Sequence, residues 1–196
     1  KYIQQIMKES IYIQKTFEKV NLIGTKIDQK EFEDCIFKQC DFSNSDFSNN
    51  VFMDCVFMDC NLSNLKLMNT SLKTVVFQNC KLIGLPFHTC NDFLFSVEFH
   101  DSNLDFASFS NKKMVKTIFN TCSIKEVSFE NTNLTNSLLD NCNLDNSIFN
   151  DTILIGVDFS SAYNYKIDPE FNTVKNAKFS TQGIAGLLSK YDIKIV

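Results

Sequence analysis

The sequence predicts an all-β solenoid, in which short parallel strands wind into a four-sided coil. Three observations lead to this fold class: a large apolar residue recurs at every fifth position, small side chains or thiols lie two positions earlier, and equivalent cysteines recur at intervals of 20 residues. A period of five suits neither an α-helix, with about 3.6 residues per turn, nor a flat strand, whose side chains alternate.

The apolar centres fall into two runs of constant phase that together make 29 units of five residues. The first run extends from Phe17 to Phe87 and the second from Leu94 to Phe159, with two extra residues within HTCNDF (88–93). Residues two apart in an extended chain point to the same side, so the centre and the small residue before it should both face inward. The remaining positions are mostly Asn, Asp, Ser, Thr or Lys, which suit exposed corners. Such a unit cannot bury its apolar face alone, so successive units must stack.

The cysteine spacing predicts four units in each coil. Cys40, Cys60 and Cys80 lie 20 residues apart, and after the two-residue slip the same column continues with Ser102, Cys122 and Cys142. A second column contains mainly phenylalanines, whose stacked rings should supply much of the apolar burial: Phe37, Phe57, Phe77, Phe99, Phe119, Leu139 and Phe159. The 29 units therefore correspond to about seven coils.

Several residues depart from this pattern. Lys112 and Asn50 occupy inward positions, and Leu65 and Leu85 are large where small residues are usual. Because a buried unpaired Lys is costly, we expect the segment 111–113 to bulge outward, with an internal salt bridge as the alternative. The slip at 88–93 is expected to form a short protruding loop or a kink.

The charge distribution restricts the class of partner. All 19 basic residues are Lys, and residues 32–161 contain 16 Asp and Glu against 8 Lys. An acidic body argues against nucleic acid as a partner and is compatible with a partner whose own site is basic. No apolar run is long enough to span a membrane, and the amino-terminal residues lack the apolar core of a signal peptide. The eight cysteines occupy repeat positions, so we expect free thiols and a cytoplasmic location.

No catalytic constellation is present, and the sequence predicts neither an enzyme nor a cofactor site. His88 and His100 are the only histidines, and neither lies in a nucleophile motif. We expect both on the surface, where His88 could contact a partner. The cysteine columns lack the CxxC spacing of zinc sites, so we interpret them as core packing and predict no metal site.

The repeat units resemble those of the pentapeptide-repeat family, whose unit is A(D/N)LXX. CDFSN (40–44), SDFSN (45–49), CNLSN (60–64), TNLTN (132–136) and CNLDN (142–146) match this unit, and the resemblance covers roughly residues 17–161. It implies a right-handed quadrilateral β-helix. We therefore divide the chain into an N-terminal segment (1–16), a β-helix (17–162) and a C-terminal segment (163–196) that contains a short helix.

The C-terminal segment is similar to that of the Qnr-type quinolone-resistance subgroup. The residues VKNAKFSTQGIAGLLSKYDIKIV (174–196) follow the repeats, and the resemblance implies a two-fold dimer through Ile184, Leu187, Leu188, Ile193 and Ile195. The alternative is a lid that covers the open edge of the last coil.

This second resemblance also implies a function. It indicates a non-enzymatic, DNA-mimicking protein that binds DNA gyrase or topoisomerase IV and modulates quinolone action. The candidate partner-binding residues are Asp101, Asp105, Asp140, Asp145, His88 and Phe95. The alternative is an interaction scaffold whose partner is not a topoisomerase, and the lysines at 112, 113 and 116 favour it.

Overall fold

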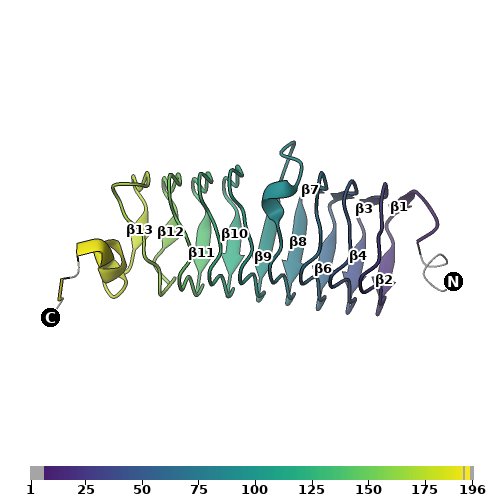
Figure 1. Ribbon diagram of the computed structural model, residues 1–196, viewed down its shortest axis with the longest axis horizontal. Coiled ribbons are helices and arrows are strands. Elements are labelled where there is room, and N and C mark those ends of the chain that lie inside the picture. Colours follow the sequence, from purple (N-terminus) through teal and green to yellow (C-terminus); the bar gives the residue numbers. More distant parts are fainter. Residues whose placement is uncertain (1–6, 192, 195–196) are drawn as a thin grey trace.

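The computed structural model describes residues 7–191 and 193–194 and shows an all-parallel β-solenoid of about eight turns (Figure 1). The predicted fold class is confirmed. The coil count is higher than the predicted seven because strands continue past both ends of the repeat runs. Strand β1 (Ile11–Ile13) precedes the first predicted centre, and β13 (Lys178–Phe179) pairs with β12 (Asp158–Phe159).

The strands form two parallel sheets on adjacent sides of the solenoid. The long sheet has nine strands in the order β13-β12-β11-β10-β9-β8-β6-β4-β2, and the short sheet has four in the order β1-β3-β5-β7. The remaining strands of the long sheet are β2 (Thr16–Glu18), β4 (Ile36–Lys38), β6 (Val56–Met58), β8 (Val75–Gln78), β9 (Val97–His100), β10 (Ile118–Asn120) and β11 (Leu138–Asp140). Those of the short sheet are β3 (Glu31–Glu33), β5 (Val51–Met53) and β7 (Ser71–Lys73).

The register between coils confirms four units per coil. Phe37 pairs with Phe57, 20 residues later, whereas Phe77 pairs with Phe99, so the two extra residues lie between these strands. Isolated parallel bridges complete the other two sides. One series contains Asn21↔Asp41 and defines the third side, and another contains Lys26↔Asp46 and defines the fourth side.

The backbone conformation at the corners explains why Asn and Asp are common two places after the apolar centres. The residue two places after most centres has a positive φ, for example 54° at Asp34 and 58° at Asn44. Asn and Asp occupy most of these positions because their short polar side chains tolerate the left-handed region better than other non-glycine residues. Each unit therefore determines its own corner locally.

The interior consists of stacked columns. Behind the long sheet, ring centroids lie 4.5 Å apart for Phe37 and Phe57 and 5.4 Å apart for Phe77 and Phe99. All eight cysteines are buried and free, as predicted. Six of the thiols contact carbonyl oxygens of the preceding coil, as Cys60 Sγ does with the oxygen of Phe37 at 3.3 Å. Two of the unusual inward residues, Leu65 and Leu85, are buried too.

Two expectations around the slip are wrong. Lys112 does not bulge outward: it is 3% exposed, and its Nζ lies 2.5 Å from Asp92 Oδ1, so the internal salt bridge is formed. The inward register does not resume at Leu94, which is 64% exposed, but with β9. The slip itself forms the expected projection, which begins with the 3₁₀-helix η1 (Phe87–Thr89) and rises above the solenoid in Figure 1.

The C-terminal segment ends in two short 3₁₀-helices instead of one α-helix, η2 (Ile184–Leu187) and η3 (Ser189–Tyr191). Ser180 Oγ accepts a hydrogen bond from the Gly183 amide at 3.0 Å in the turn before η2. Within the described residues, no helix is long and apolar enough to cross a membrane.

Candidate functional site

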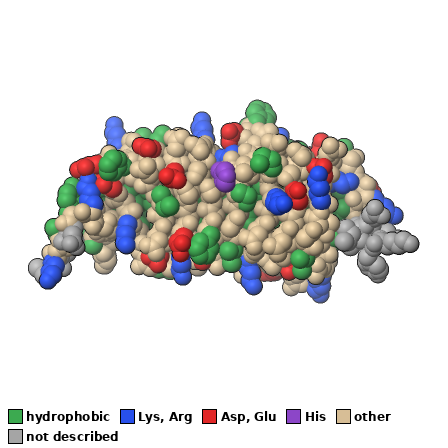
Figure 2. Space-filling view, in the orientation of Figure 1, with side chains coloured by type: hydrophobic (Ala, Val, Ile, Leu, Met, Phe, Trp, Pro, Cys, Tyr) green, Lys and Arg blue, Asp and Glu red, His purple; other side chains and the backbone are tan. Residues whose placement is uncertain are grey.

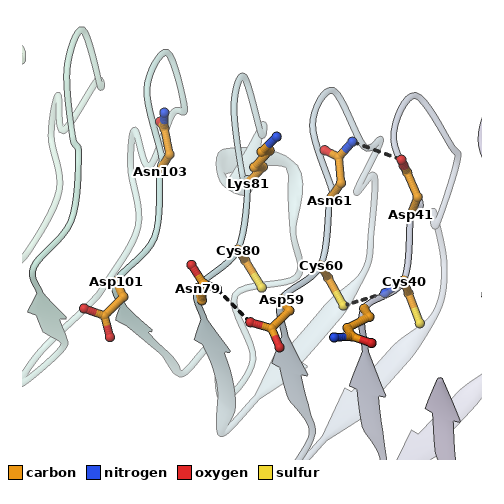
Figure 3. A pocket seen from close by; sticks show the side chains of 11 residues that line it. Cys40, Asp41, Asp59, Cys60, Asn61, Asn79, Cys80, Lys81, Asp101 and Asn103 are labelled. Atoms are coloured by element: carbon orange, nitrogen blue, oxygen red, sulfur yellow. Dashed lines mark hydrogen bonds between the residues drawn. The ribbon is translucent and has the colours of Figure 1, made fainter. Parts of the chain in front are cut away.

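An open groove runs along the corner between the long sheet and the third side (Figure 3). It has a volume of about 550 Å³ and crosses the coils of Asp41, Asn61, Lys81 and Asn103. Its back consists of Cys40, Cys60 and Cys80, and its rim consists of amides, carboxylates and Lys81. Asn79 Nδ2 donates a hydrogen bond to Asp59 Oδ1 at 2.7 Å, which ties neighbouring coils together at the rim.

Four of the predicted partner-binding residues lie along the third side, Asp101 and Asp140 at its corner with the long sheet and Asp105 and Asp145 at its corner with the fourth side. Asp101 is exposed and lines the groove, while Asp105, Asp140 and Asp145 are half-buried. Asp105 Oδ1 accepts hydrogen bonds from Ser123 Oγ at 2.7 Å and from the Lys125 amide at 3.0 Å. These four carboxylates therefore flank the third side of the solenoid, two at each of its corners.

The acidic residues do not merge into a single sheet of charge. On the third side, the bridged positions run Asp41, Asn61, Lys81 and Asn103, so this column holds one carboxylate, two amides and one lysine. Figure 2 likewise shows acidic side chains separated by neutral and basic ones on the face in view. The acidic character of the body comes from a majority of carboxylates and not from a uniform stripe.

The other two predicted partner-binding residues lie elsewhere. His88 is exposed on η1, on the fourth side, where its amide bonds to the Ser108 oxygen at 3.0 Å. Phe95 belongs to the projection and is half-buried against the core. The structure therefore does not bring His88 and Phe95 to the third side, which the four carboxylates flank.

The projection contains residues that the sequence reasoning did not select. Phe93 and Leu94 are 69% and 64% exposed, and they form its tip. Lys112 holds its base from inside the solenoid, since its Nζ also donates to the Cys90 oxygen at 2.5 Å. The available signal was a lysine at an inward position about one coil after a two-residue insertion.

The Cys55 and Cys90 thiols are poor candidates for nucleophilic chemistry. Burial raises the pKa of the Cys55 thiol to about 12 and that of Cys90 to about 12. A raised pKa leaves little thiolate at neutral pH, so these sulfurs are weak nucleophiles. His100 Nε2 lies 3.5 Å from Glu98 Oε2 on the outer surface of the long sheet. Across residues 7–191 and 193–194, no group of three or more potential ligands could hold a metal ion.

The C-terminal segment closes the end of the solenoid. The Ile167 amide bonds to the Gly186 oxygen at 3.1 Å, and Leu187 packs partly buried against the core. Lys190 Nζ lies 2.6 Å from Glu170 Oε2 and 2.9 Å from Asp168 Oδ1. The hydrogen bond from Lys190 holds the pKa of Glu170 below its usual value.

The residues predicted to form a dimer are divided between this lid and the solvent. Leu187 and Leu188 are half-buried, whereas Ile184 and Ile193 are 47% and 56% exposed. Ile195 lies outside the described residues. The lid is therefore observed in the single chain, and two apolar side chains near it remain open to solvent.

Comparison with known protein families and structures agrees with this architecture. The model of the pentapeptide repeat region matches residues 30–109, and that of pentapeptide repeats (8 copies) matches residues 122–160. A search of curated protein sequences finds no match.

Among solved structures, a trypsin-treated variant of QnrB1, described as a plasmid-mediated fluoroquinolone resistance protein, is similar to this chain. The TM-score is 0.65 at 18% identity, over 92% of this chain and 100% of the other. A second trypsin-treated variant of QnrB1 has a TM-score of 0.62 at 16% identity, over 95% and 98%. Full-length QnrB1 has a TM-score of 0.55 at 18% identity, over 91% and 100%. At these identities the likeness concerns the fold, and the repeat matches show that the chain belongs to the pentapeptide-repeat family.

Proposed function

We propose that this protein is a non-enzymatic binding protein whose acidic rod occupies the DNA-binding surface of DNA gyrase or topoisomerase IV and thereby modulates quinolone action. The observation that carries the proposal is the excess of carboxylates, 16 against 8 lysines over residues 32–161, on a narrow unbranched solenoid. A basic groove that accommodates DNA also attracts a rod of opposite charge. The resemblance in fold to a fluoroquinolone resistance protein supports the choice of target. A cytoplasmic location, with its reducing conditions, agrees with eight free thiols.

A charge-reversal series tests this proposal. Purified protein should inhibit supercoiling by its own organism's gyrase, or protect that enzyme from quinolone-stabilised cleavage. The effect should weaken with added salt, because the reach of surface charge is about 8 Å near physiological ionic strength. Changing Asp101, Asp105, Asp140 and Asp145 to Lys should abolish it.

A matched control separates the effect of the four carboxylates on the third side from the effect of net charge. Asp34, Asp54, Glu130 and Asp151 are exposed at other corners or sides, and changing them to Lys alters the net charge equally. This control should retain the effect. The proposal fails if the unchanged protein, at high micromolar concentration, affects neither gyrase nor topoisomerase IV.

A second candidate function is an interaction scaffold with no topoisomerase activity. The mixed charge of the third side, where neutral residues and Lys81 stand beside a single bridged carboxylate, favours it, because a close imitation of DNA would carry charge of one sign. Loss of the effect on gyrase both in the variant with Lys at 101, 105, 140 and 145 and in the matched control would indicate nonspecific charge effects and would favour this candidate.

We also propose a homodimer through the C-terminal segment. Ile184 and Ile193 are exposed beside the lid and would be covered by a second copy. Changing both to Asp should convert a dimer into a folded monomer, as measured by light scattering. The control is a change of Ile13, which is 52% exposed in β1, to Asp, and this variant should remain a dimer. A monomeric unchanged protein would remove this proposal.

A further inference from the structure

The projection interrupts the side of the solenoid that carries the short sheet. The short sheet ends at β7, and after the projection the same side continues as the isolated bridges Lys113↔Asn133, Asn133↔Ile153 and Ile153↔Thr173. The base of the projection stays attached to the coil before it. The Asn91 amide bonds to the Thr70 oxygen at 2.9 Å, and the Ser96 amide bonds to the Leu72 oxygen at 3.0 Å. The residues between these two attachments leave the ladder.

An ion pair between the buried Lys112 and the exposed Asp92 ties the projection to the next coil. Lys112 Nζ contacts Asp92 Oδ1 at 2.5 Å and lies 5.3 Å from the centroid of the Phe95 ring. Leu94 has a φ of 57°, which is uncommon for a residue of this type and persists only where the surroundings enforce it. The contacts of Lys112 with Asp92 and Phe95 therefore hold the base from which the tip projects.

Two large apolar side chains remain in solvent at this tip. Phe93 is 69% exposed and Leu94 is 64% exposed, and hydrophobic side chains crown the projection in Figure 2. Neighbouring apolar side chains that stay exposed on an otherwise polar surface commonly mark a contact with a partner.

The charges beside the tip are positive, in contrast to the rest of the body. Lys73, at the end of β7, places its Nζ 5.5 Å from the centroid of the Phe93 ring. Lys113 and Lys116 are exposed on the same side, one coil after the projection. Asp92 is the acidic residue of the projection, and it is paired with Lys112. We name this area, consisting of Phe93, Leu94, Lys73, Lys113 and Lys116, the loop surface.

We propose that the loop surface binds an acidic protein segment that carries a large apolar residue. The apolar residue would pack on Phe93 and Leu94, while carboxylates of the segment would face the three lysines. This partner is acidic, whereas the topoisomerase surface proposed to bind the carboxylates of the third side is basic. The two sites are therefore separable by experiment. A nucleic acid or an anionic membrane fits less well, because the surrounding body repels extended negative charge.

Selection from a random peptide display library tests this inference without any topoisomerase, so its outcome is independent of the function proposed above. The full chain should enrich acidic peptides that contain Phe, Leu, Ile or Trp. A synthetic copy of the most enriched peptide is then titrated by fluorescence anisotropy. Its Kd should rise at least tenfold when Lys73, Lys113 and Lys116 are changed to Glu, and at least tenfold when Phe93 and Leu94 are changed to Ser, a change of about 1.4 kcal/mol.

Matched variants on other sides serve as controls. Lys38, Lys66 and Lys125 are exposed lysines, and changing them to Glu gives the same change in net charge. Met68 and Phe106 are 53% and 58% exposed, and changing them to Ser removes similar apolar area. Neither control should alter the Kd by more than about threefold.

Four results would each overturn the inference. These are the absence of any enriched peptide, enrichment of basic or uncharged peptides, equal losses in the control variants, and tighter binding to phosphatidylglycerol vesicles or to a DNA duplex through the same three lysines.

Discussion

The long and short sheets are built from the same repeat, yet only the short one is interrupted. The long sheet passes the insertion without a break, since β8 pairs with β9 over four residue pairs and its register changes from 20 to 22 residues. The short sheet stops at β7. A parallel solenoid can thus accommodate an insertion without a break in the long sheet, because that sheet needs only a constant offset between coils.

The two regions also differ in what keeps them in place. Behind the long sheet, stacking is local and repetitive, with Phe99 and Phe119 centroids 5.1 Å apart. At the interruption, a single buried cation replaces the repeated pattern, and its partners lie 20 and 22 residues earlier in the chain. Regular packing therefore stabilises one side, and one specific ion pair stabilises the projection on the other.

The largest effect is expected in the unbroken stack. Changing Phe77 to Ala should lower the free energy of unfolding by about 3–5 kcal/mol, since the ring is buried between Phe57 and Phe99, and Phe119 should behave alike. Urea unfolding followed by circular dichroism measures the loss. Phe106, 58% exposed, is the control and should cost less than about 0.5 kcal/mol. A loss below about 1 kcal/mol at both Phe77 and Phe119 would contradict the inward register.

An intermediate effect is expected at the ion pair, and its asymmetry is informative. Changing Asp92 to Ala leaves the buried Lys112 charge with the Cys90 oxygen and should cost about 1–3 kcal/mol. Changing Lys112 to Met leaves Asp92, whose side chain is 82% exposed, free to be hydrated, so this loss should stay below about 1 kcal/mol. Both variants should increase hydrogen exchange of residues 91–96. A larger loss in the Lys112 variant would show that the pair stabilises the whole solenoid and not the projection.

The smallest effect is expected when the interruption is removed. A chain that lacks Asn91 and Asp92 and carries Thr in place of Lys112 restores the 20-residue spacing and puts Leu94 at an inward centre five residues after Phe87, with Thr as at 132 and 152 of the next coils. Its stability should change by less than about 1 kcal/mol, because loop-closure entropy varies slowly with length. A crystal structure should show the short sheet extended beyond β7. A chain that unfolds or keeps its projection would mean that the insertion is required by the coils around it.

The five-residue repeat could be predicted from the sequence because the conformation of each unit depends on residues that are close together in the chain. The inward centre, the small residue before it and the left-handed corner lie within a few residues of one another, as at Cys40, Phe42 and Asn44. The cysteine spacing then determined the size of the coil. The position of Asp101 at an outward corner followed from the same rule.

Only the tertiary structure decided the features that depend on distant partners. Lys112 could face inward because the Cys90 oxygen and Asp92, one coil earlier, neutralise the cost of its burial. The lid could dock because Gly186 has no side chain: a Cβ there would lie 2.2 Å from the Tyr165 oxygen. A sequence shows which residues repeat, but the free energy of a buried charge or a close backbone contact depends on what the fold places against it.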